Sequence, residues 1–216
     1  TDLVHAAHPR MTRVRTTLDP GVQAEAERLL RRQVGAYAHA GLTNGAVVVI
    51  ENATGDILAM VGSVSHAAAS IQGQVNGATS PRSPGSALKP LVYALAFEHG
   101  VVLPDTILPD VPVSYSGYRP ENFDLSWQGL VRADRAMAWS LNIPAIDLLQ
   151  MTGLSRSVRF MRDAGLATLS RPPGEYGLSL AIGTCAVTLL DLTNAYAMLA
   201  RGGRFLPPRM VLEGRH

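Results

Sequence analysis

Ser86 and Lys89 lie three positions apart, and their side chains could form a nucleophile and its base. Lys89 is the single lysine among 19 basic residues, and the other 18 are arginine. A guanidinium group stays protonated, whereas a buried ammonium group can lose its proton and then accept one from a serine hydroxyl. Residues three apart share one face of a helix, so the two side chains could meet. The spacing therefore predicts a Ser–Lys nucleophilic pair.

The pair also has a simpler interpretation, because a lone lysine is a solvated surface group in most proteins. Its context favours chemistry. Pro90 directly follows Lys89, and proline is tolerated in the first turn of a helix. Apolar side chains then surround a helix that we expect to end at Gly100. Burial in such a helix would lower the pKa of Lys89, and the helix dipole would favour negative charge on Ser86.

Two more polar residues, Ser140 and Asn142, lie between two predicted helices. As isolated residues they are typical helix caps, and Asn142 would be the N-cap of the helix that begins at Ile143. Beside a Ser-x-x-Lys pattern they become candidates for relaying protons and holding a substrate. The predicted site therefore comprises Ser86, Lys89, Ser140 and Asn142, and capping is the alternative role of the last two.

Composition and charge limit the class of protein. The chain has 216 residues, of which 47% are hydrophobic and 17% charged, with a net charge of +2. These values fit one large domain, or one domain of two lobes, with a well-buried core. The arginines are scattered, so we expect no nucleic-acid partner. No apolar run approaches the ~20 residues of a membrane span.

Residues that commonly bind metals or form disulfides are few. Cys185 is the one cysteine, so an internal disulfide and a cysteine-based zinc cluster are excluded, and we expect it to be a small buried residue. The six histidines lack the i, i+4 spacing of a metal-binding helix. We therefore expect no metal and no cofactor.

The first part of the chain predicts strands and one helix. Residues 13–18 alternate polar and apolar side chains as a strand does, and Asp19 with the following proline begins a helix that ends near Gly41. Residues 46–51 and 57–62 are apolar runs on either side of a turn, and they predict a hairpin covered on both faces. The next stretch, to residue 85, has no periodicity and predicts a loop.

The rest of the chain predicts mainly helices. A proline-rich connector at 104–120 contains a candidate edge strand at 111–115. Further helices are expected at 129–139, 143–152, 155–164 and 188–201. The sequence thus predicts an α+β fold, with residues 13–62 in the N-terminal part of a β lobe and residues 84–203 in a mainly helical lobe. The Ser–Lys pair would lie at their junction.

The motifs and their flanking sequence resemble one family. Ser86-Ala87-Leu88-Lys89 and Ser140-Leu141-Asn142 resemble the first two of three active-site motifs in penicillin-binding transpeptidases and serine β-lactamases. The flanking sequence resembles class A, bifunctional penicillin-binding proteins, most of all the penicillin-binding protein 1C subgroup. The segments that carry this resemblance are Thr17–Gln23, Gly45–Ile50, Gly55–Gly62, Arg119–Asp124 and Ser140–Ala145. It extends over residues 13–206.

The resemblance implies a fold and a mechanism. The fold is an antiparallel sheet with flanking helices and an all-helical lobe. Ser86 would attack the carbonyl between the last two D-alanines of a peptidoglycan stem peptide, and Lys89 would take its proton. Ser140 would protonate the leaving D-alanine, Asn142 would hold the substrate amide and orient Lys89, and the N–H of Ser86 would form half of an oxyanion hole. Peptidoglycan stem peptides would be the substrates and β-lactam antibiotics covalent inhibitors. Gly183 and Thr184 would border the cleft.

The third motif of that family, Lys-Thr/Ser-Gly, is absent because Lys89 is the only lysine. We expect residues 1–216 to be a partial transpeptidase domain that stops before the strands of that motif. Loss of one oxyanion donor costs about 10²–10³ in rate, so this segment is expected to be inefficient. The resemblance also implies a glycosyltransferase domain and a membrane anchor before Thr1, and a location on the outer face of the bacterial cytoplasmic membrane.

Three functions remain open from the sequence. The first is a D,D-transpeptidase module that cross-links stem peptides. The second is a DD-carboxypeptidase or β-lactamase, which shares the Ser–Lys chemistry but transfers the acyl group to water. The third is a catalytically impaired module that binds β-lactams or serves as a scaffold, and the missing third motif favours it. The segments around the hairpin and Ser140 favour the transpeptidase.

Overall fold

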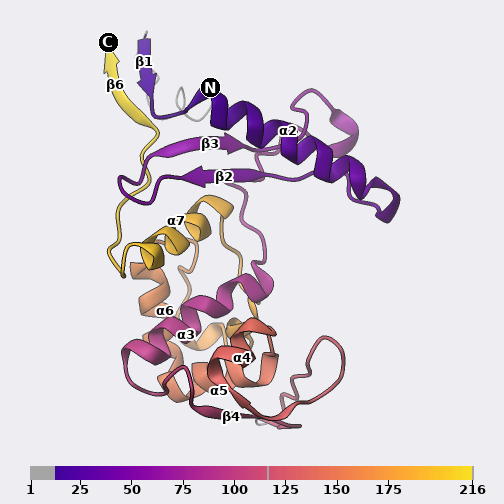
Figure 1. Cartoon of the computed structure of the whole chain (residues 1–216), viewed down its shortest axis with the longest axis vertical. Coiled ribbons are helices and arrows are strands. Elements are labelled where there is room, and N and C mark those ends of the chain that lie inside the picture. The colour runs from indigo at the N-terminus through magenta and orange to yellow at the C-terminus, as the bar shows by residue number, and fades with distance from the viewer. Residues whose placement is uncertain (1–12, 116, 216) are drawn as a thin grey trace. The chain divides into compact units, whose positions relative to one another are not determined.

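The computed structural model describes residues 13–115 and 117–215, and the chain forms two compact units (Figure 1). Residues 1–12 of the predicted domain lie outside the described residues. Among those described, unit 1 contains 13–81, 164–166 and 187–215, and unit 2 contains 82–163 and 167–186. In the described ranges the strands form three two-stranded antiparallel sheets, which alternate with helices along the chain. This is the α+β class that the sequence predicts.

The hairpin of unit 1 consists of β2 (Val47–Ile50) and β3 (Ile57–Val61). The strands are antiparallel, and Val47 lies opposite Val61. Every residue of β3 is buried or half-buried in alternation, and all of β2 is half-buried. The predicted hairpin is confirmed, and so is the expectation that neither face is left to solvent.

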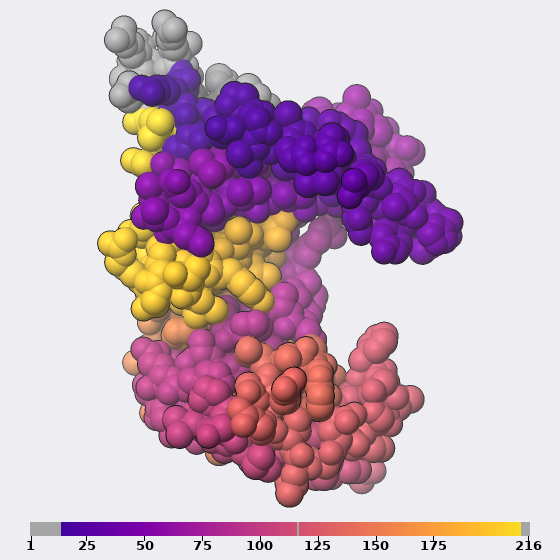
Figure 2. All heavy atoms as spheres, in the orientation of Figure 1, coloured from indigo at the N-terminus to yellow at the C-terminus, as the bar shows by residue number. Residues whose placement is uncertain are grey.

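Helix α2 (Pro20–Ala36) packs against the hairpin through a stripe of apolar side chains. The carboxylate of Asp19 caps it, accepting the N–H of Val22 at 2.9 Å. The core at this contact consists of Ala26, Leu30, Ala59 and Val61. The opposite side of α2 lies at the surface, where its indigo side chains form a continuous band (Figure 2). The predicted stop at Gly41 belongs to a short 3₁₀ turn that follows the helix.

Helix α7 (Leu189–Ala200) also belongs to unit 1, where it contacts β2. Figure 1 shows it on the side of the hairpin opposite α2. The hairpin is thus covered by one helix on each side, which explains why both of its strands are apolar throughout. The prediction that this helix belongs to the helical lobe is therefore wrong, because periodicity carries no information on which partner a helix packs against.

A second sheet of unit 1 pairs β1 (Arg13–Thr16) with β6 (Val211–Arg215). The sequence predicts β1 but not β6, whose glycine and glutamate weaken the strand pattern. Arg209, just before β6, is joined to the hairpin turn by an ion pair with Asp56, with Nε 2.7 Å from the carboxylate oxygen. The segment 211–215 is therefore a strand because it pairs with β1, which lies far away in the sequence.

Helix α5 (Asn142–Thr152) lies at the centre of unit 2. It contacts α3 (Lys89–Glu98), α4 (Ala133–Ala138) and α6 (Leu154–Asp163). Nearly every residue of its first two turns is buried, as expected for a helix that is apolar all round. The predicted bounds of α5, α6 and α7 are right to within one residue. No helix among the described residues is long and apolar enough to cross a membrane.

The predicted helix at 129–139 is wrong over its first four residues. These form β5 (Gly129–Arg132), which pairs antiparallel with β4 (Ile107–Asp110). Gly129 has φ +74°, outside the helical region, and Arg132 is extended at the start of α4. The candidate strand at 111–115 is also misplaced, since the strand ends at Asp110 and Tyr115 forms only an isolated bridge with Tyr118.

We predict that Asp19→Ala lowers the free energy of unfolding by about 0.5–2 kcal/mol, because it leaves the N–H groups at the start of α2 without their cap. Thermal denaturation followed by circular dichroism measures the change. Glu25→Ala is the matched control, since Glu25 lies on the exposed face of the same helix in an ion pair with Arg28. That variant should stay within ~0.5 kcal/mol of the parent. Equal melting of both variants would contradict the capping role.

Candidate active site

Lys89 is the buried cation around which the predicted site residues gather. Its side chain is 1% exposed. The Nζ group donates to the backbone oxygen of Ser140 at 2.5 Å, to Ser140 Oγ at 3.1 Å and to Asn142 Oδ1 at 2.7 Å. An ammonium group has three hydrogens, so each has an acceptor. The structure therefore brings three of the four predicted residues together.

The environment of Lys89 shifts its protonation equilibrium toward the neutral form. Among the described residues, no carboxylate forms an ion pair with this ammonium group. Burial lowers the pKa of Lys89 from 10.5 to about 8, because the charged form is the one that loses hydration. About a tenth of the side chains would then be neutral at pH 7, and the neutral amine is the form that can act as a general base.

Ser86 lies one turn before Lys89, in the 3₁₀ helix Gly85–Leu88 that leads into α3. The N–H of Lys89 donates to the backbone oxygen of Ser86, and in a 3₁₀ helix residues i and i+3 are stacked. Ser86 is exposed, and within the described residues its Oγ forms no hydrogen bond with Lys89. Catalytic hydrogen bonds often form only once substrate is bound.

The turn that carries Ser86 is braced by a second glycine. Gly183 follows the 3₁₀ helix η5 (Leu178–Ile182) with φ +81°. A Cβ atom there would lie 2.6 Å from Gly85 Cα and closer still to the backbone nitrogen and oxygen of Gly85. Ser83 Oγ donates to the Gly183 oxygen at 2.7 Å. Gly183, expected only to border a cleft, thus touches the backbone next to Ser86.

Ser140 has an unusual backbone that directs its oxygens toward Lys89. It follows α4 with φ +56°, a left-handed conformation that is uncommon for a residue other than glycine. Its N–H donates to Met137 O at 3.0 Å, which holds the turn at the end of the helix. Such conformations cost about 1–3 kcal/mol and cluster at functional sites. Ser140 serves here as two acceptors for one cation.

Asn142 does not cap α5, so the capping interpretation of this residue is wrong. The N-cap position is Leu141, and Asn142 is already the first residue of the helix. Its side chain instead bridges two groups, accepting from Lys89 and donating through Nδ2 to Glu121 O at 2.7 Å. The Asn142 N–H donates to the side chain of Asn122 at 2.7 Å. Residues 121 and 122 therefore hold Asn142, a role that the sequence analysis missed.

Other candidate groups contribute less to this arrangement. Cys185 is buried as predicted, and burial raises the pKa of its thiol. Tyr115 donates its hydroxyl to Asp147 on α5. In the part of the chain that the structure describes, no group of three or more histidine, cysteine, aspartate and glutamate side chains could hold a metal ion.

Comparisons with known proteins identify the family. The penicillin-binding protein transpeptidase domain matches residues 45–214. Penicillin-binding protein 1C of Escherichia coli is 35% identical over 89% of this chain and 25% of its own length. Penicillin-binding protein 1F of Bacillus subtilis is 30% identical over 92% of this chain and 27% of its own. The chain thus spans about a quarter of the length of these curated relatives.

A solved structure agrees. The crystal structure of penicillin-binding protein 1A from Haemophilus influenzae has 28% identity and a TM-score of 0.68, covering 80% of this chain and 25% of that one. The region that matches the transpeptidase domain family, residues 45–214, contains both predicted motifs, the Ser-x-x-Lys turn and the Ser140–Asn142 segment. This chain belongs to the transpeptidase domain family of the class A penicillin-binding proteins.

Proposed function

We propose that this chain is a serine-type peptidoglycan D,D-transpeptidase module whose nucleophile is Ser86. The observation that carries the proposal is the environment of Lys89. The only lysine is buried, its pKa is lowered to about 8, and its three donors are held by Ser140 and Asn142. Ser86 lies one 3₁₀ turn before it, at the surface.

The number of donors on Lys89 suggests how the base acts. The ammonium form has three N–H donors for three acceptors, whereas the neutral amine has two N–H donors and one lone pair. Loss of a proton therefore breaks one of the three contacts and creates an acceptor. That lone pair takes the proton of Ser86 Oγ as the oxygen attacks the carbonyl between the terminal D-alanines.

The acyl transfer then proceeds in two steps, acylation of Ser86 and transfer to the acceptor amine. The C–N bond to the last D-alanine breaks, and its nitrogen receives a proton through Ser140 Oγ, which lies 3.1 Å from Lys89 Nζ. An ester to Ser86 remains. In the second step the amine of a neighbouring stem peptide attacks this ester. A new amide bond forms, the C–O bond to Ser86 breaks, and a proton from the amine passes through Lys89 to Ser86 Oγ. The N–H of Ser86 stabilises the oxyanion in both steps.

A second candidate function uses the same acyl-enzyme on Ser86. A module that is acylated by β-lactams but turns over stem peptides poorly would act as a binding or scaffold element. Transfer to water, as in a carboxypeptidase or β-lactamase, uses the same acyl-enzyme. The proposed location is the outer face of the cytoplasmic membrane, with the anchor and glycosyltransferase domain outside this segment.

Acylation of Ser86 tests the proposal directly. The protein is incubated with excess benzylpenicillin, and intact-protein mass spectrometry with peptide mapping locates the adduct. We expect one adduct per chain on the peptide that contains Ser86, and none in Ser86→Ala. Ser155→Ala is the matched control, because Ser155 is an exposed serine of α6 outside the site, and it should retain the adduct. An unmodified parent protein, or an adduct elsewhere, would overturn the assignment. Rapid loss of the adduct would favour the hydrolase.

Lys89 can be titrated directly because it is the only lysine. Protein labelled with ¹³C-lysine gives one side-chain signal, and we expect its midpoint near pH 8 rather than 10.5. Since the neutral form is the base, the acylation rate should rise about tenfold per pH unit below the midpoint and level off above it. Lys89→Arg keeps the charge but has no accessible neutral form, so it should lose acylation at every pH. A midpoint near 10.5 would be evidence against this role.

Gly183→Ala should slow acylation, because its Cβ would displace the backbone of Gly85 beside the nucleophile. A displacement of about 1 Å can cost roughly 100-fold in rate. Gly41→Ala is the matched control, since Gly41 is also left-handed, with φ +84°, but has nothing within 4 Å of an added Cβ. It should share the backbone strain without the rate loss. Equal acylation rates in the Gly183 variant and the parent would show that the contact is not needed.

A further inference from the structure

Asp110 is a buried carboxylate that the proposed mechanism does not use. It ends β4 and is 0% exposed. Its oxygens accept from Asn122 Nδ2 at 2.9 and 3.0 Å and from the backbone N–H of Gln128 at 2.8 Å. None of the ion pairs among the described residues includes it. A charge buried without a cation is costly unless hydrogen bonds satisfy it, so these three contacts fix the position of Asn122.

Asn122 in turn is fully used as a donor and acceptor. It is 4% exposed. Besides Asp110, its Nδ2 donates to Ser126 O at 2.8 Å, and its Oδ1 accepts the N–H of Asn142 at 2.7 Å. The latter contact satisfies the N–H of the first residue of α5, one of the free N–H groups at the helix start, where the side chain of Leu141 cannot accept a hydrogen bond. A side chain 20 residues away thus acts as an external cap for this one group.

This external cap leaves the Asn142 side chain available for Lys89. Asn142 Nδ2 donates to Glu121 O, next to Asn122, and Asn142 Oδ1 accepts from Lys89. The segment 121–122 therefore holds Asn142 at both its backbone and its side chain. An unbroken series of hydrogen bonds runs from the Asp110 carboxylate to the Lys89 ammonium group.

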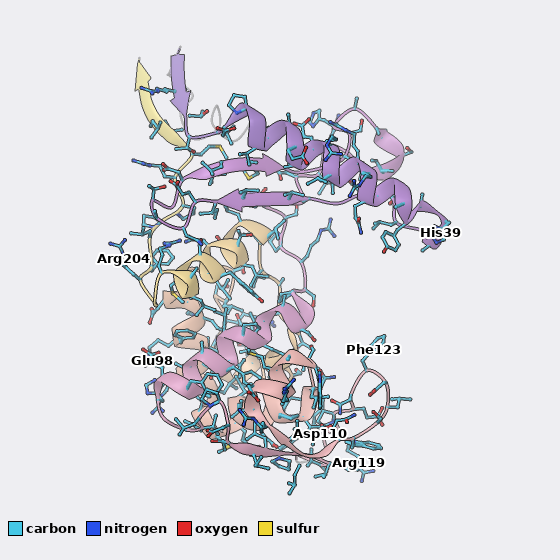
Figure 3. The ribbon with its side chains drawn as sticks, viewed as in Figure 1. His39, Glu98, Asp110, Arg119, Phe123 and Arg204 are labelled. Carbon is cyan, nitrogen blue, oxygen red and sulfur yellow. The ribbon has the colours of Figure 1, made fainter. Side chains whose placement is uncertain are left out.

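The tip of the loop that carries Asn122 is exposed. Phe123 is fully exposed and Leu125 is 65% exposed with φ +58°. Figure 3 shows Phe123 at the free end of the loop and Asp110 at its base. Among the described residues of this loop, Pro120 and Asn122 are the buried ones, so the Asp110–Asn122 contact is one of the few that hold its tip.

We propose that Asp110 and Asn122 are positioning residues of the acyl-transfer site, which fix Asn142 and, through it, Lys89. The catalytic part of this inference rests on the proposed function, but the effect of the two residues on Lys89 can be tested separately. A merely structural pair would stabilise the loop without affecting the environment of Lys89.

The test uses a conservative change and a double-mutant cycle. In Asp110→Asn one carboxylate oxygen becomes an NH2 donor. Because Asn122 Nδ2 lies within 3.0 Å of both carboxylate oxygens, either orientation of the new amide places a donor against Asn122 Nδ2. Asn122→Ala removes the acceptor of the Asn142 N–H, and the double variant Asp110→Asn/Asn122→Ala tests whether Asp110 acts through Asn122.

The single ¹³C-lysine signal and the benzylpenicillin acylation rate are the two measurements. In Asp110→Asn we expect the Lys89 midpoint to fall below that of the parent, because the charged form loses the Asn142 acceptor. Acylation should slow about 10–100-fold, as expected for a displaced catalytic group. Asn122→Ala should change both values in the same direction, and the double variant should differ from Asn122→Ala by less than about threefold in rate. A cooperative thermal transition followed by circular dichroism shows that the variants are folded.

Asp124→Asn is the matched control, since Asp124 lies in the same loop but is exposed and bonds only within its own turn, to Ser126. It should leave the Lys89 signal and the rate unchanged. An unchanged Lys89 signal in Asp110→Asn, or additive effects of the two substitutions in the double variant, would overturn the positioning role. If the parent is not acylated at all, the proposed function fails, and the Lys89 signal still decides the positioning role.

Discussion

The buried ammonium group of Lys89 is the constraint on which the site in unit 2 depends. A cation removed from water needs an acceptor for every proton, and no carboxylate of the described residues supplies one. Three neutral oxygens therefore converge on it, two from Ser140 and one from Asn142. Neutral acceptors satisfy the charge without cancelling it, so desolvation still lowers the pKa. A carboxylate in their place would raise the pKa and remove the base.

That requirement explains the local structure around α5. Asn142 cannot both cap its helix and bind Lys89, and it binds Lys89. The free N–H at the helix start is satisfied by Asn122, and Asn122 is held by the buried carboxylate of Asp110. Ser140, just before, adopts a left-handed backbone that points both of its oxygens the same way. Each local departure from a regular helix end thus follows from one cation.

Sequence patterns predict the parts of this arrangement that are local. The Ser-x-x-Lys spacing, the buried α3 and the bounds of α5 follow from residues within a few positions of each other. The bracing of Ser86 by Gly183 and the capping of Asn142 by Asn122 do not, because they join residues about 100 and 20 positions apart. The helix expected at 129–139 failed for a similar reason. Its first four residues pair with β4, and tertiary pairing overrides local helix propensity.

The lowered pKa of Lys89 also opposes folding at neutral pH. The unfolded chain would hold this proton up to about pH 10.5, whereas the folded chain releases it at about 8. Between these values the unfolded state binds more protons, so stability rises with pH through this window and is lowest below it. Lys89 therefore destabilises the folded state most at the pH values at which it is charged. The apolar packing of α3 and α5 both creates that penalty and offsets it, since the same buried surface that desolvates Lys89 stabilises unit 2. A base of this kind can exist only in a helix core that is large enough to tolerate it.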